Sequence, residues 1–460
     1  MQLCTDRAAR FRWVVCQLDV LRRCRSPAKL KKALKSLPKT LDETYDRILA
    51  SIEEDDKRDA LNLLQWLAFS VRTISLDEAV EVLATDPSAE DGCQFDPQQR
   101  LRDPRDVLSI CSSLVTLTNL DVRTDIKKGD GDKDEETSRD LAMTGLKLAH
   151  FSVREYLVSD YLRQSSDTRV LFYHFDKIAD TLIATTCLAY LLQFNRHKCV
   201  GSNTALTHPL SVYAASYWMD HARSDTDGQS EPLHKHIMDL LKPMDPVYTN
   251  WISIHDPSPY RYTSVQRSAS TCTPLYYTAL GGLERASRTL LSNGSDVNAQ
   301  GGGYGHCLQA ASAEGHDAIV RLLIAHGADV NAQGVFWGNG LQGASFGGHY
   351  ATVQMLLEHG ADVNAQGGDH RNALSAASFQ GHYTIVQLLL LHGADVNAPA
   401  GNLGIRYMQP HSWVTMQSTS YCWNKARTST HKETSGIYCR RHRKQATMSS
   451  FGRCWSRVWM

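Results

Sequence analysis

Very few residues of this chain combine the types and the spacing that a reaction would need. The run from Lys127 to Glu136 is the nearest approach to a phosphate-binding loop, but it lacks the GxxxxGK(S/T) spacing and a strand-to-helix context. As a calcium loop, the same run supplies Asp130, Asp132 and Asp134, and then lacks the glycine and the last glutamate that such a loop requires. We therefore predict that the chain is not an enzyme and binds no cofactor.

Cysteine and histidine form no complete metal-binding pattern either. Cys439 and His442 have the spacing of half a zinc site, but no second pair accompanies them. His316, His349 and His382 recur at intervals of 33 residues, so we predict that they hydrogen-bond between repeating units and that no metal site exists. The 12 cysteines are scattered without a CxxC pair. This favours reduced thiols in the cytoplasm, with an unrecognised disulfide as the alternative.

The elements that must position any functional residue follow a 33-residue period. The hexapeptide Gly-Ala-Asp-Val-Asn-Ala begins at Gly327, Gly360 and Gly393, with a near copy at Gly294. A Gly-His pair keeps the same step. These marks are the ankyrin signature, which predicts a solenoid of four repeats over 271–400, each with two antiparallel helices and a projecting finger. Ankyrin stacks bind other macromolecules, so the expected partner is a protein.

The third repeat shows the expected layout most clearly. Its inner helix begins with Leu341 to Ser345 and ends before Gly348. Its outer helix covers 352–359, with an apolar face that includes Val353, Leu356 and Leu357, and Gly360 ends it in a left-handed conformation.

Aromatic and basic residues set in glycines mark the expected finger tips, and such residues are common in binding hot spots. The predicted partner-binding residues are Tyr304, Phe336, Trp337, His370 and Arg371. The alternative for Phe336 and Trp337 is that they only pack on the neighbouring finger.

The periodicity stops at residue 400. Plausible codons for the ankyrin stretch Leu-Leu-Glu-Gln-Gly-Ala-Asp-Val-Asn-Thr-Gln-Gly, read one base late, give the string that runs from Cys422 to Lys432. We therefore predict that 401–460 is a repeat array translated out of frame, and that it is disordered. The basic cluster from Arg440 to Lys444 has an alternative interpretation as a nuclear localisation or RNA-binding patch.

The N-terminal half predicts helices over residues 1–37 and a small domain over 38–165. Its helices are expected at 58–69, at 75–83 with Ser75 and Glu78 as a capping box, and from Asp103 to Cys111. Segments 114–120 and 146–150 read as a hairpin around an acidic loop at 121–141. Three helices and a hairpin are the layout of a winged helix. Ser152 and Glu155 are expected to cap the next helix, and 166–268 to form a helical spacer.

Charge and hydropathy exclude two classes of partner. The net charge is zero, and the third helix carries Asp103 and Asp106 beside Arg105, so neither this helix nor the acidic loop suits a nucleic acid backbone. No run of about 18 apolar residues occurs, so no membrane span is expected.

Four strings resemble one family of proteins, the NACHT-type signalling NTPases with ankyrin repeats that are abundant in filamentous fungi. The strings cover residues 11–19, 37–45, 110–115 and 148–157, and the resemblance extends over about 8–400. It implies a P-loop NTPase domain upstream, a winged helix resembling that of the GPI inositol-deacylase family, a helical segment and an ankyrin sensor. The sequence contains no P-loop, so we expect a chain that begins late in a longer protein, with 1–37 as the remnant after the NTPase domain.

The expected fold is mainly α: a winged helix, a helical spacer, an ankyrin solenoid and a disordered tail. The expected function is a non-catalytic interaction or sensor scaffold, of a signalling protein of the innate-immunity or heterokaryon-incompatibility type. Two alternatives stay open: an NTP-dependent switch whose P-loop domain is missing from this sequence, and a gene remnant without function.

Overall fold

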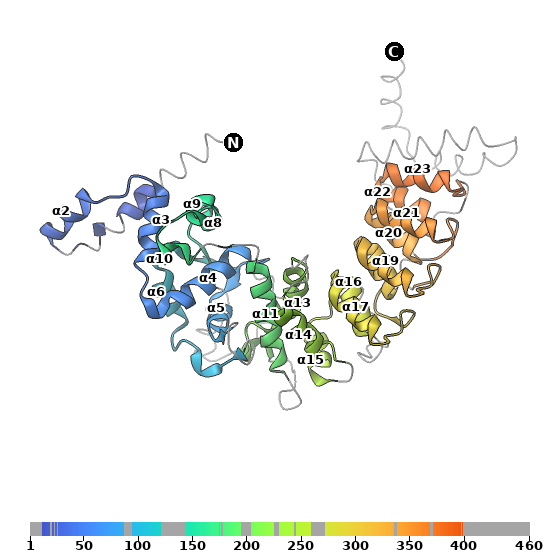
Figure 1. The fold of residues 1–460 in the computed structure, drawn as a ribbon, viewed down its shortest axis with the longest axis horizontal. Coiled ribbons are helices and arrows are strands. Elements are labelled where there is room, and N and C mark those ends of the chain that lie inside the picture. Colours follow the sequence, from blue (N-terminus) through green and yellow to red (C-terminus); the bar gives the residue numbers. More distant parts are fainter. Residues whose placement is uncertain are drawn as a thin grey trace, which may run out of the picture. The chain divides into compact units, whose positions relative to one another are not determined.

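In the computed structural model of the chain, the sequence period is also the period of the helices. The structure describes residues 12–398 apart from 19–20, 23, 25, 87–93, 121–143, 174, 176–177, 195–203, 225–229, 243–244, 259–271, 335–337, 369–370 and 397. The acidic loop, the tail and the Cys439–His442 pair therefore lie outside the described residues. The chain divides into two units, Met1–Asp256 and Pro257–Met460. The described part is mainly helical, as the sequence predicts (Figure 1).

Four helix pairs make up the described part of the second unit, and corresponding helices begin 33 residues apart. The inner helices are α16 (Pro274–Gly281), α18 (Cys307–Glu314), α20 (Gly340–Gly347) and α22 (Ala373–Gln380). The outer helices are α17 (Glu284–Ser292), α19 (Asp317–Ala325), α21 (Tyr350–Glu358) and α23 (Tyr383–Leu391). Strands β6 (Gln300–Gly301) and β7 (Gly305–His306) pair in the first finger. The prediction of four repeats is thus confirmed in its helices.

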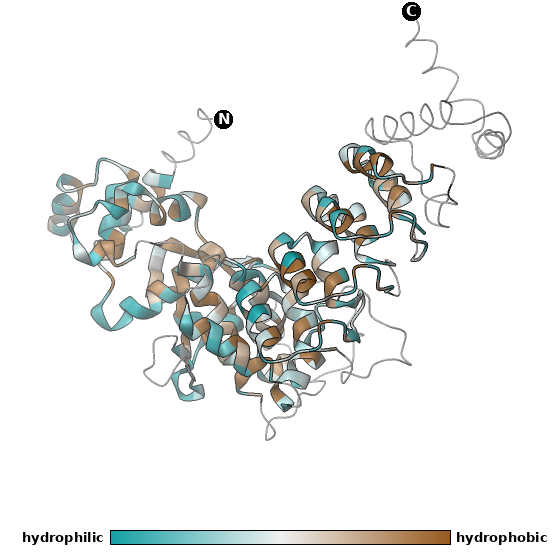
Figure 2. Cartoon of the chain, turned by 45° about the vertical axis from the view of Figure 1, so that its right-hand side comes forward, coloured by the Kyte–Doolittle hydropathy of each residue, from teal (hydrophilic) through white to brown (hydrophobic). Residues whose placement is uncertain are grey.

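Small residues and glycines set the length and spacing of the inner helices. Ala310, Ala344 and Ala377 are fully buried where consecutive inner helices pack on one another. Each inner helix ends at a glycine in the left-handed region, for example Gly348 at φ 83°. The predicted apolar face of the third outer helix is buried at Val353 and Leu356. Hydrophobic residues concentrate on the helices, whereas the fingers are mostly hydrophilic or neutral (Figure 2).

The first unit begins with irregular helices and continues into a bundle. Residues 12–18 are helical, and Ser26 and Pro27 then start a separate helix, because Ser26 caps it and proline suits its first position. The helices are α2 (Pro27–Lys35), α3 (Leu41–Ala50), α4 (Lys57–Phe69), α5 (Leu76–Leu83), α6 (Val107–Cys111), α8 (Phe151–Leu157), α9 (Asp160–Arg163), α10 (Thr168–Leu171), α11 (Ile178–Leu192), α12 (Thr204–Thr207), α13 (Ser211–Ala222), α14 (Glu231–Leu240) and α15 (Pro246–Ile254). Short 3-10 turns are η1 (Glu54–Asp56), η2 (Pro97–Gln99), η3 (Pro104–Asp106) and η4 (Ser112–Leu114).

A three-stranded antiparallel sheet lies beside α4, α5 and α6. Its strands are β1 (Ile74–Ser75), β4 (Val115–Asn119) and β5 (Thr144–Leu148), in the order β1-β5-β4. Two shorter strands, β2 (Thr85–Asp86) and β3 (Gln94–Phe95), pair separately. The predicted hairpin is therefore present as β4 and β5, and the Ser75–Glu78 capping box opens α5 as expected.

The predicted cap at Ser152 is wrong. Helix α8 begins at Phe151, two residues before the start that a Ser152 cap would give, and His150 is its N-cap, because the His150 ring accepts a hydrogen bond from the Ser152 amide at 3.2 Å. The Ser152 hydroxyl is instead within 2.8 Å of the Tyr45 hydroxyl. A side chain held by a distant tyrosine is not free to cap its own helix.

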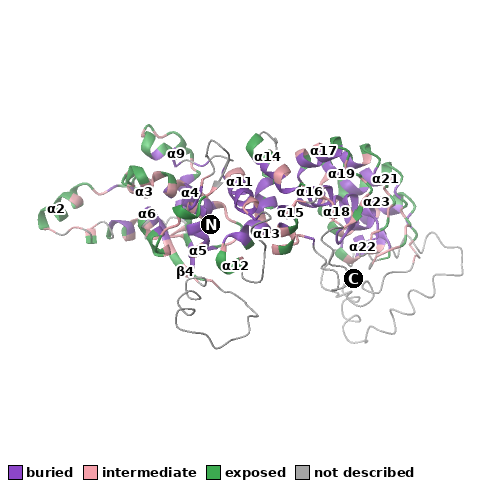
Figure 3. Cartoon of the chain, turned by 90° about the horizontal axis from the view of Figure 1, so that it is seen from below, coloured by how far each residue is buried: buried purple, intermediate pink, exposed green. Residues whose placement is uncertain are grey.

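Buried residues of the first unit concentrate along α11 and α13, which pack on each other (Figure 3). Trp218 and Tyr213 of α13 are fully buried there. Helix α11 also contacts α4 and the β2–β3 pair, so the helices after residue 166 share one packed unit with those before it. None of the described helices is long and apolar enough to cross a membrane.

Candidate partner-binding surface of the repeat stack

Histidines fasten each repeat to the one before it. The Nε2 atom of His316 lies 3.1 Å from the carbonyl oxygen of Leu280, and His349 and His382 make the corresponding bonds to Ala313 and Phe346 at 2.9 and 3.0 Å. Because a carbonyl only accepts, Nε2 must carry the proton. The prediction that these histidines bond between repeats is confirmed.

The glycine before each histidine is required for a second reason besides its backbone. A Cβ atom on Gly315 would lie 2.2 Å from the ring of His349, and one on Gly348 would lie 2.6 Å from the ring of His382. The positive φ of both glycines would also strain any other residue. The recurring Gly and His of the sequence are thus parts of one contact between consecutive repeats, called a joint below.

Asparagines form a second set of joints, which the sequence analysis did not identify. Asn331 donates from Nδ2 to the carbonyl of Gly360 at 3.1 Å and accepts the amide of Asp362 at 2.8 Å. Asn298 and Asn364 repeat this geometry in their own repeats. The hexapeptide carried a signal for these bonds, because its Asn recurs together with the Gly and Asp that it contacts. The sequence does not show, however, that the Gly and Asp belong to the next repeat in space.

Tyr304 lies inside the stack, which corrects its prediction as an exposed finger residue. Its side chain is 6% exposed, and its hydroxyl donates to Glu314 at 2.9 Å. Its amide donates to the hydroxyl of Tyr276 at 3.2 Å. An aromatic ring held in this way between a finger and the helices has little surface to offer a partner.

Phe336, Trp337 and His370 lie outside the described residues. Their role in partner binding stays a prediction.

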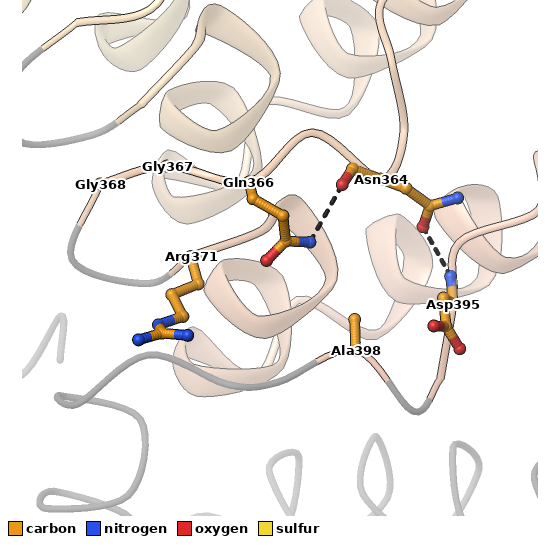
Figure 4. A pocket seen from close by; sticks show the side chains of 7 residues that line it. All are labelled: Asn364, Gln366, Gly367, Gly368, Arg371, Asp395 and Ala398. Atoms are coloured by element: carbon orange, nitrogen blue, oxygen red, sulfur yellow. Dashed lines mark hydrogen bonds between the residues drawn. The ribbon is translucent and has the colours of Figure 1, made fainter.

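Arg371 is the predicted finger residue that the structure places on the surface. Its φ is 64°, the only positive φ of a non-glycine residue in the described part of the chain. The side chain lines an open cup of about 790 Å³ formed by Asn364, Gln366, Gly367, Gly368, Arg371, Asp395 and Ala398. Gln366 donates to the carbonyl of Asn364 at 3.0 Å, while Arg371 and Asp395 stand on opposite sides of the cup (Figure 4).

One string of the inner helices has the spacing of a hydrolase nucleophile elbow, a match that the sequence analysis overlooked. Gly343, Ser345 and Gly347 fit GxSxG, but they lie within α20 and not in a turn from strand to helix. Ser345 is fully buried. The string therefore serves the close packing of inner helices.

The first unit contains a hydrogen-bonded chain of a partly exposed acid, a buried histidine and a buried tyrosine. Nδ1 of His221 lies 2.7 Å from Asp180, and Nε2 lies 2.9 Å from the hydroxyl of Tyr213. This order of groups could relay a proton, but Tyr213 is fully buried and its hydroxyl accepts the amide of Val71 at 3.1 Å. Burial also raises the pKa of Tyr213 above its ordinary value. The chain of groups is structural and holds the turn after α4 against α13.

A second buried cluster is centred on Glu81. The carboxylate pairs with Arg100 at 2.6 Å and accepts the hydroxyl proton of Tyr190 at 2.7 Å. Burial and the neighbouring carboxylate raise the pKa of Tyr190. The cluster joins α5 to α11 and offers no open site. Within the described ranges, no three His, Cys, Asp or Glu residues are grouped so as to hold a metal ion.

Comparison with known proteins places the periodic region in a family. Residues 308–400 match the family model of ankyrin repeats in three copies, and the first helix pair precedes the matched segment. The azaphilone pigments biosynthesis cluster protein L of Monascus ruber is 35% identical to this chain over 313 residues. The match covers 64% of this chain and 61% of that protein, so the chain spans less than two thirds of its relative.

Proposed function

We propose that the chain is a non-catalytic interaction or sensor scaffold in the cytoplasm, and that its ankyrin stack binds a protein partner. The observation that carries the proposal is the stack itself, four helix pairs with exposed fingers. The histidines and asparagines that recur most regularly are used between repeats. The surface left for a partner consists of the fingers and the inner-helix side, where stacks of this kind recognise other proteins.

The charge of the repeats favours a protein over a nucleic acid. Between residues 271 and 400 the sequence has four arginines and no lysine, against nine acids (4 − 9 = −5). The arginines are Arg285, Arg288, Arg321 and Arg371; the acids are Glu284, Asp296, Glu314, Asp317, Asp329, Glu358, Asp362, Asp369 and Asp395. Phosphate backbones require a basic face, which this stack does not provide.

The first unit supports a finer proposal about origin. Helices α4, α5 and α6 with the sheet order β1-β5-β4 fit a winged helix, and we propose that the chain derives from the NACHT-type signalling proteins that its sequence resembles. The name of the Monascus relative refers to a pigment biosynthesis cluster and to no reaction. Calorimetric titration with MgATP should give no binding; a saturable signal would favour the NTP-dependent switch instead.

Site-specific photo-crosslinking tests the binding surface. A photo-reactive phenylalanine analogue placed at Gln366 in a finger should give an adduct with a discrete cellular protein, and the same analogue at the exposed Glu155 of the first unit should not. Adducts from position 155 alone would contradict the proposal. The approach also avoids lysine-reactive reagents, since the stack contains no lysine.

A further inference from the structure

Arg371 occupies a position where the preceding fingers have glycine. Stepping back by 33 residues leads to Gly338 and then to Gly305, whose φ angles are 75° and 101°. A residue with a Cβ atom is disfavoured in this left-handed region. Arginine at such a site is therefore an outlier in the chain's own pattern, and outliers of this kind cluster at functional sites.

The surrounding turn fixes the backbone of Arg371 but makes no use of its side chain. The carbonyl oxygen accepts the amide of Gly367 at 2.9 Å and the side chain of Gln342 at 3.1 Å, and the Arg371 amide donates to Gly368 at 3.3 Å. Glycine could make all three bonds equally well. The structure of the finger therefore does not explain why arginine is present.

Space for the arginine is made by a second change in the same repeat. At Gly338, a Cβ atom would lie 1.5 Å from Oε1 of Gln342, whose side chain reaches back to the amide of Asn339. The residue one repeat after Gln342 is Ser375, which is too short to reach back in this way. The finger that leads into the fourth repeat is thus locally adapted to the larger residue.

The side chain of Arg371 is exposed, and it carries the single guanidinium or ammonium group of the described fingers and inner helices. Arg285, Arg288 and Arg321 all lie on outer helices, so Arg371 is the one Arg or Lys of the described fingers and inner helices. No ion pair or hydrogen bond joins its guanidinium to any residue in the described part of the structure. Asp395 stands across the same cup.

We propose that Arg371 binds a single carboxylate of the partner, an aspartate or glutamate side chain or a chain end, in an otherwise neutral or basic peptide segment. The inference rests on the proposed function of the stack and names the chemistry that one finger recognises. A guanidinium presents its donors as a fork that matches the two oxygens of a carboxylate. Gln366 borders the same cup, and its side-chain oxygen can accept a hydrogen bond from the peptide backbone.

Asp395, on the side of the cup opposite Arg371, favours a carboxylate over a phosphate as the bound group. Asp395, together with the net negative charge of the repeats, repels a dianion more strongly than a monoanion. Phosphate sites usually combine several cations or helix amides, whereas this cup has one arginine. One carboxylate is therefore accepted, and further acidic residues beside it should weaken binding.

A peptide array with the purified full chain tests the inference. Each dodecapeptide of the first set has a mixed neutral and basic background around a fixed centre, which is Glu, Gln, phosphoserine or three consecutive Glu. The peptides of a second set end in a free carboxylate or in an amide. We expect Glu peptides to bind about twofold to fivefold more tightly than Gln peptides, the range of an exposed ion pair. Arg371→Gly should abolish this preference without lowering the melting temperature, while Arg285→Ala on an outer helix should leave it intact.

The other outcomes are distinguishable. Binding of Glu and Gln peptides to the same degree would overturn the carboxylate site and leave the proposed function standing. Tightest binding of phosphoserine or of triple Glu would also overturn it, in favour of a polyanion site. Failure of every peptide to bind would count against both the proposed function and this inference. A lower melting temperature for Arg371→Gly would assign the arginine a structural role instead.

Discussion

Each of the two units of this chain is stabilised by polar contacts within itself, and the separation in sequence between the contacting residues differs greatly from one unit to the other. In the repeat stack, the histidine and asparagine bonds join residues 29 to 36 positions apart and end on backbone atoms. In the first unit, buried side-chain bonds join residues 107 and 109 positions apart, at Tyr45–Ser152 and Tyr190–Glu81, and the Tyr213 hydroxyl accepts the amide of Val71, 142 positions away. The stack repeats two kinds of short-range joint, whereas the first unit depends on a few long-range bonds.

This difference teaches how each unit should respond to damage. A solenoid is stabilised by terms between neighbouring repeats, so the loss of one joint removes one increment. A buried cluster that satisfies several groups at once is more costly to break, because the groups that remain are left unpaired in a poorly solvated interior. The following predictions test that contrast.

The largest effect is expected for Glu81→Ala. It removes a carboxylate whose side chain is 4% exposed and leaves Arg100 and Tyr190 without their common partner. Arg100 is about one third exposed and can regain water, so we expect a loss of about 2–4 kcal/mol in the free energy of unfolding. Urea unfolding followed by the fluorescence of Trp66, Trp218 and Trp251, which are buried in the first unit, measures it.

Two further variants control this measurement. Glu155→Ala removes an exposed carboxylate of the same unit and should change the free energy by less than about 0.5 kcal/mol. Tyr190→Phe combined with Glu81→Ala should cost less than the sum of the two single changes, since both act on one cluster. Additive losses would contradict the idea of a coupled network.

A smaller loss is expected when one joint of the stack is removed. His349→Ala deletes the bond to the carbonyl of Ala313 and should lower the free energy of unfolding by about 1–2 kcal/mol. His359→Ala is the matched control, because that ring bonds only to Met355 of its own helix at 2.8 Å. Chemical unfolding followed by circular dichroism measures both.

The two units differ most directly in whether the free-energy costs of two substitutions add. His316→Ala and His382→Ala act on joints two repeats apart, so their combined cost should equal the sum within about 0.5 kcal/mol. Strong coupling between these two positions would show that the stack behaves as a network, like the cluster around Glu81, and would remove the contrast.

The separation in sequence between contacting residues also decides which features could be predicted from the sequence. The helix pairs, the Gly-His joints and the Ser75–Glu78 cap rest on neighbouring or periodic residues, and the structure bears them out. The bond of Tyr190 to Glu81 has no local signal, because its partners lie 109 residues apart. Periodicity also has a limit: it located the finger of Tyr304 but could not tell that the ring turns inward to Glu314.

His306 offers a pH-dependent test within the stack. It occupies the N-cap of α18 without a capping bond, whereas the corresponding Asn339 and Asn372 cap α20 and α22 through their side chains. Burial lowers the pKa of His306, against a smaller opposing effect of Asp329, so the folded state favours the neutral ring. The resulting stability is present above the unfolded pKa of about 6.5 and is lost as the pH falls below it.

His306→Asn should therefore stabilise the stack by about 1 kcal/mol at pH 7, by supplying the cap that the later repeats have. The advantage should grow as the pH is lowered to 5, because asparagine does not titrate. Thermal unfolding at both pH values measures the change, with His326→Asn, whose ring bonds within its own helix, as the control. An equal gain at both pH values would rule out protonation of His306 as a cause of acid sensitivity.

The smallest effect concerns Arg371 and is expected to raise stability. Arg371→Gly relieves a positive φ of 64°, which should add about 0.5–1 kcal/mol to the free energy of unfolding after the greater chain entropy of unfolded glycine is allowed for.

The size of this gain should depend on Ser375. In the third repeat, Gly338 makes room for Gln342, which completes a capping box with Asn339. Ser375→Gln should consequently destabilise the chain while Arg371 is present, and stabilise it in the Arg371→Gly background. Thermal unfolding of the four proteins in this cycle gives the coupling. Equal effects of Ser375→Gln in both backgrounds would mean that arginine and serine were not selected together in this finger.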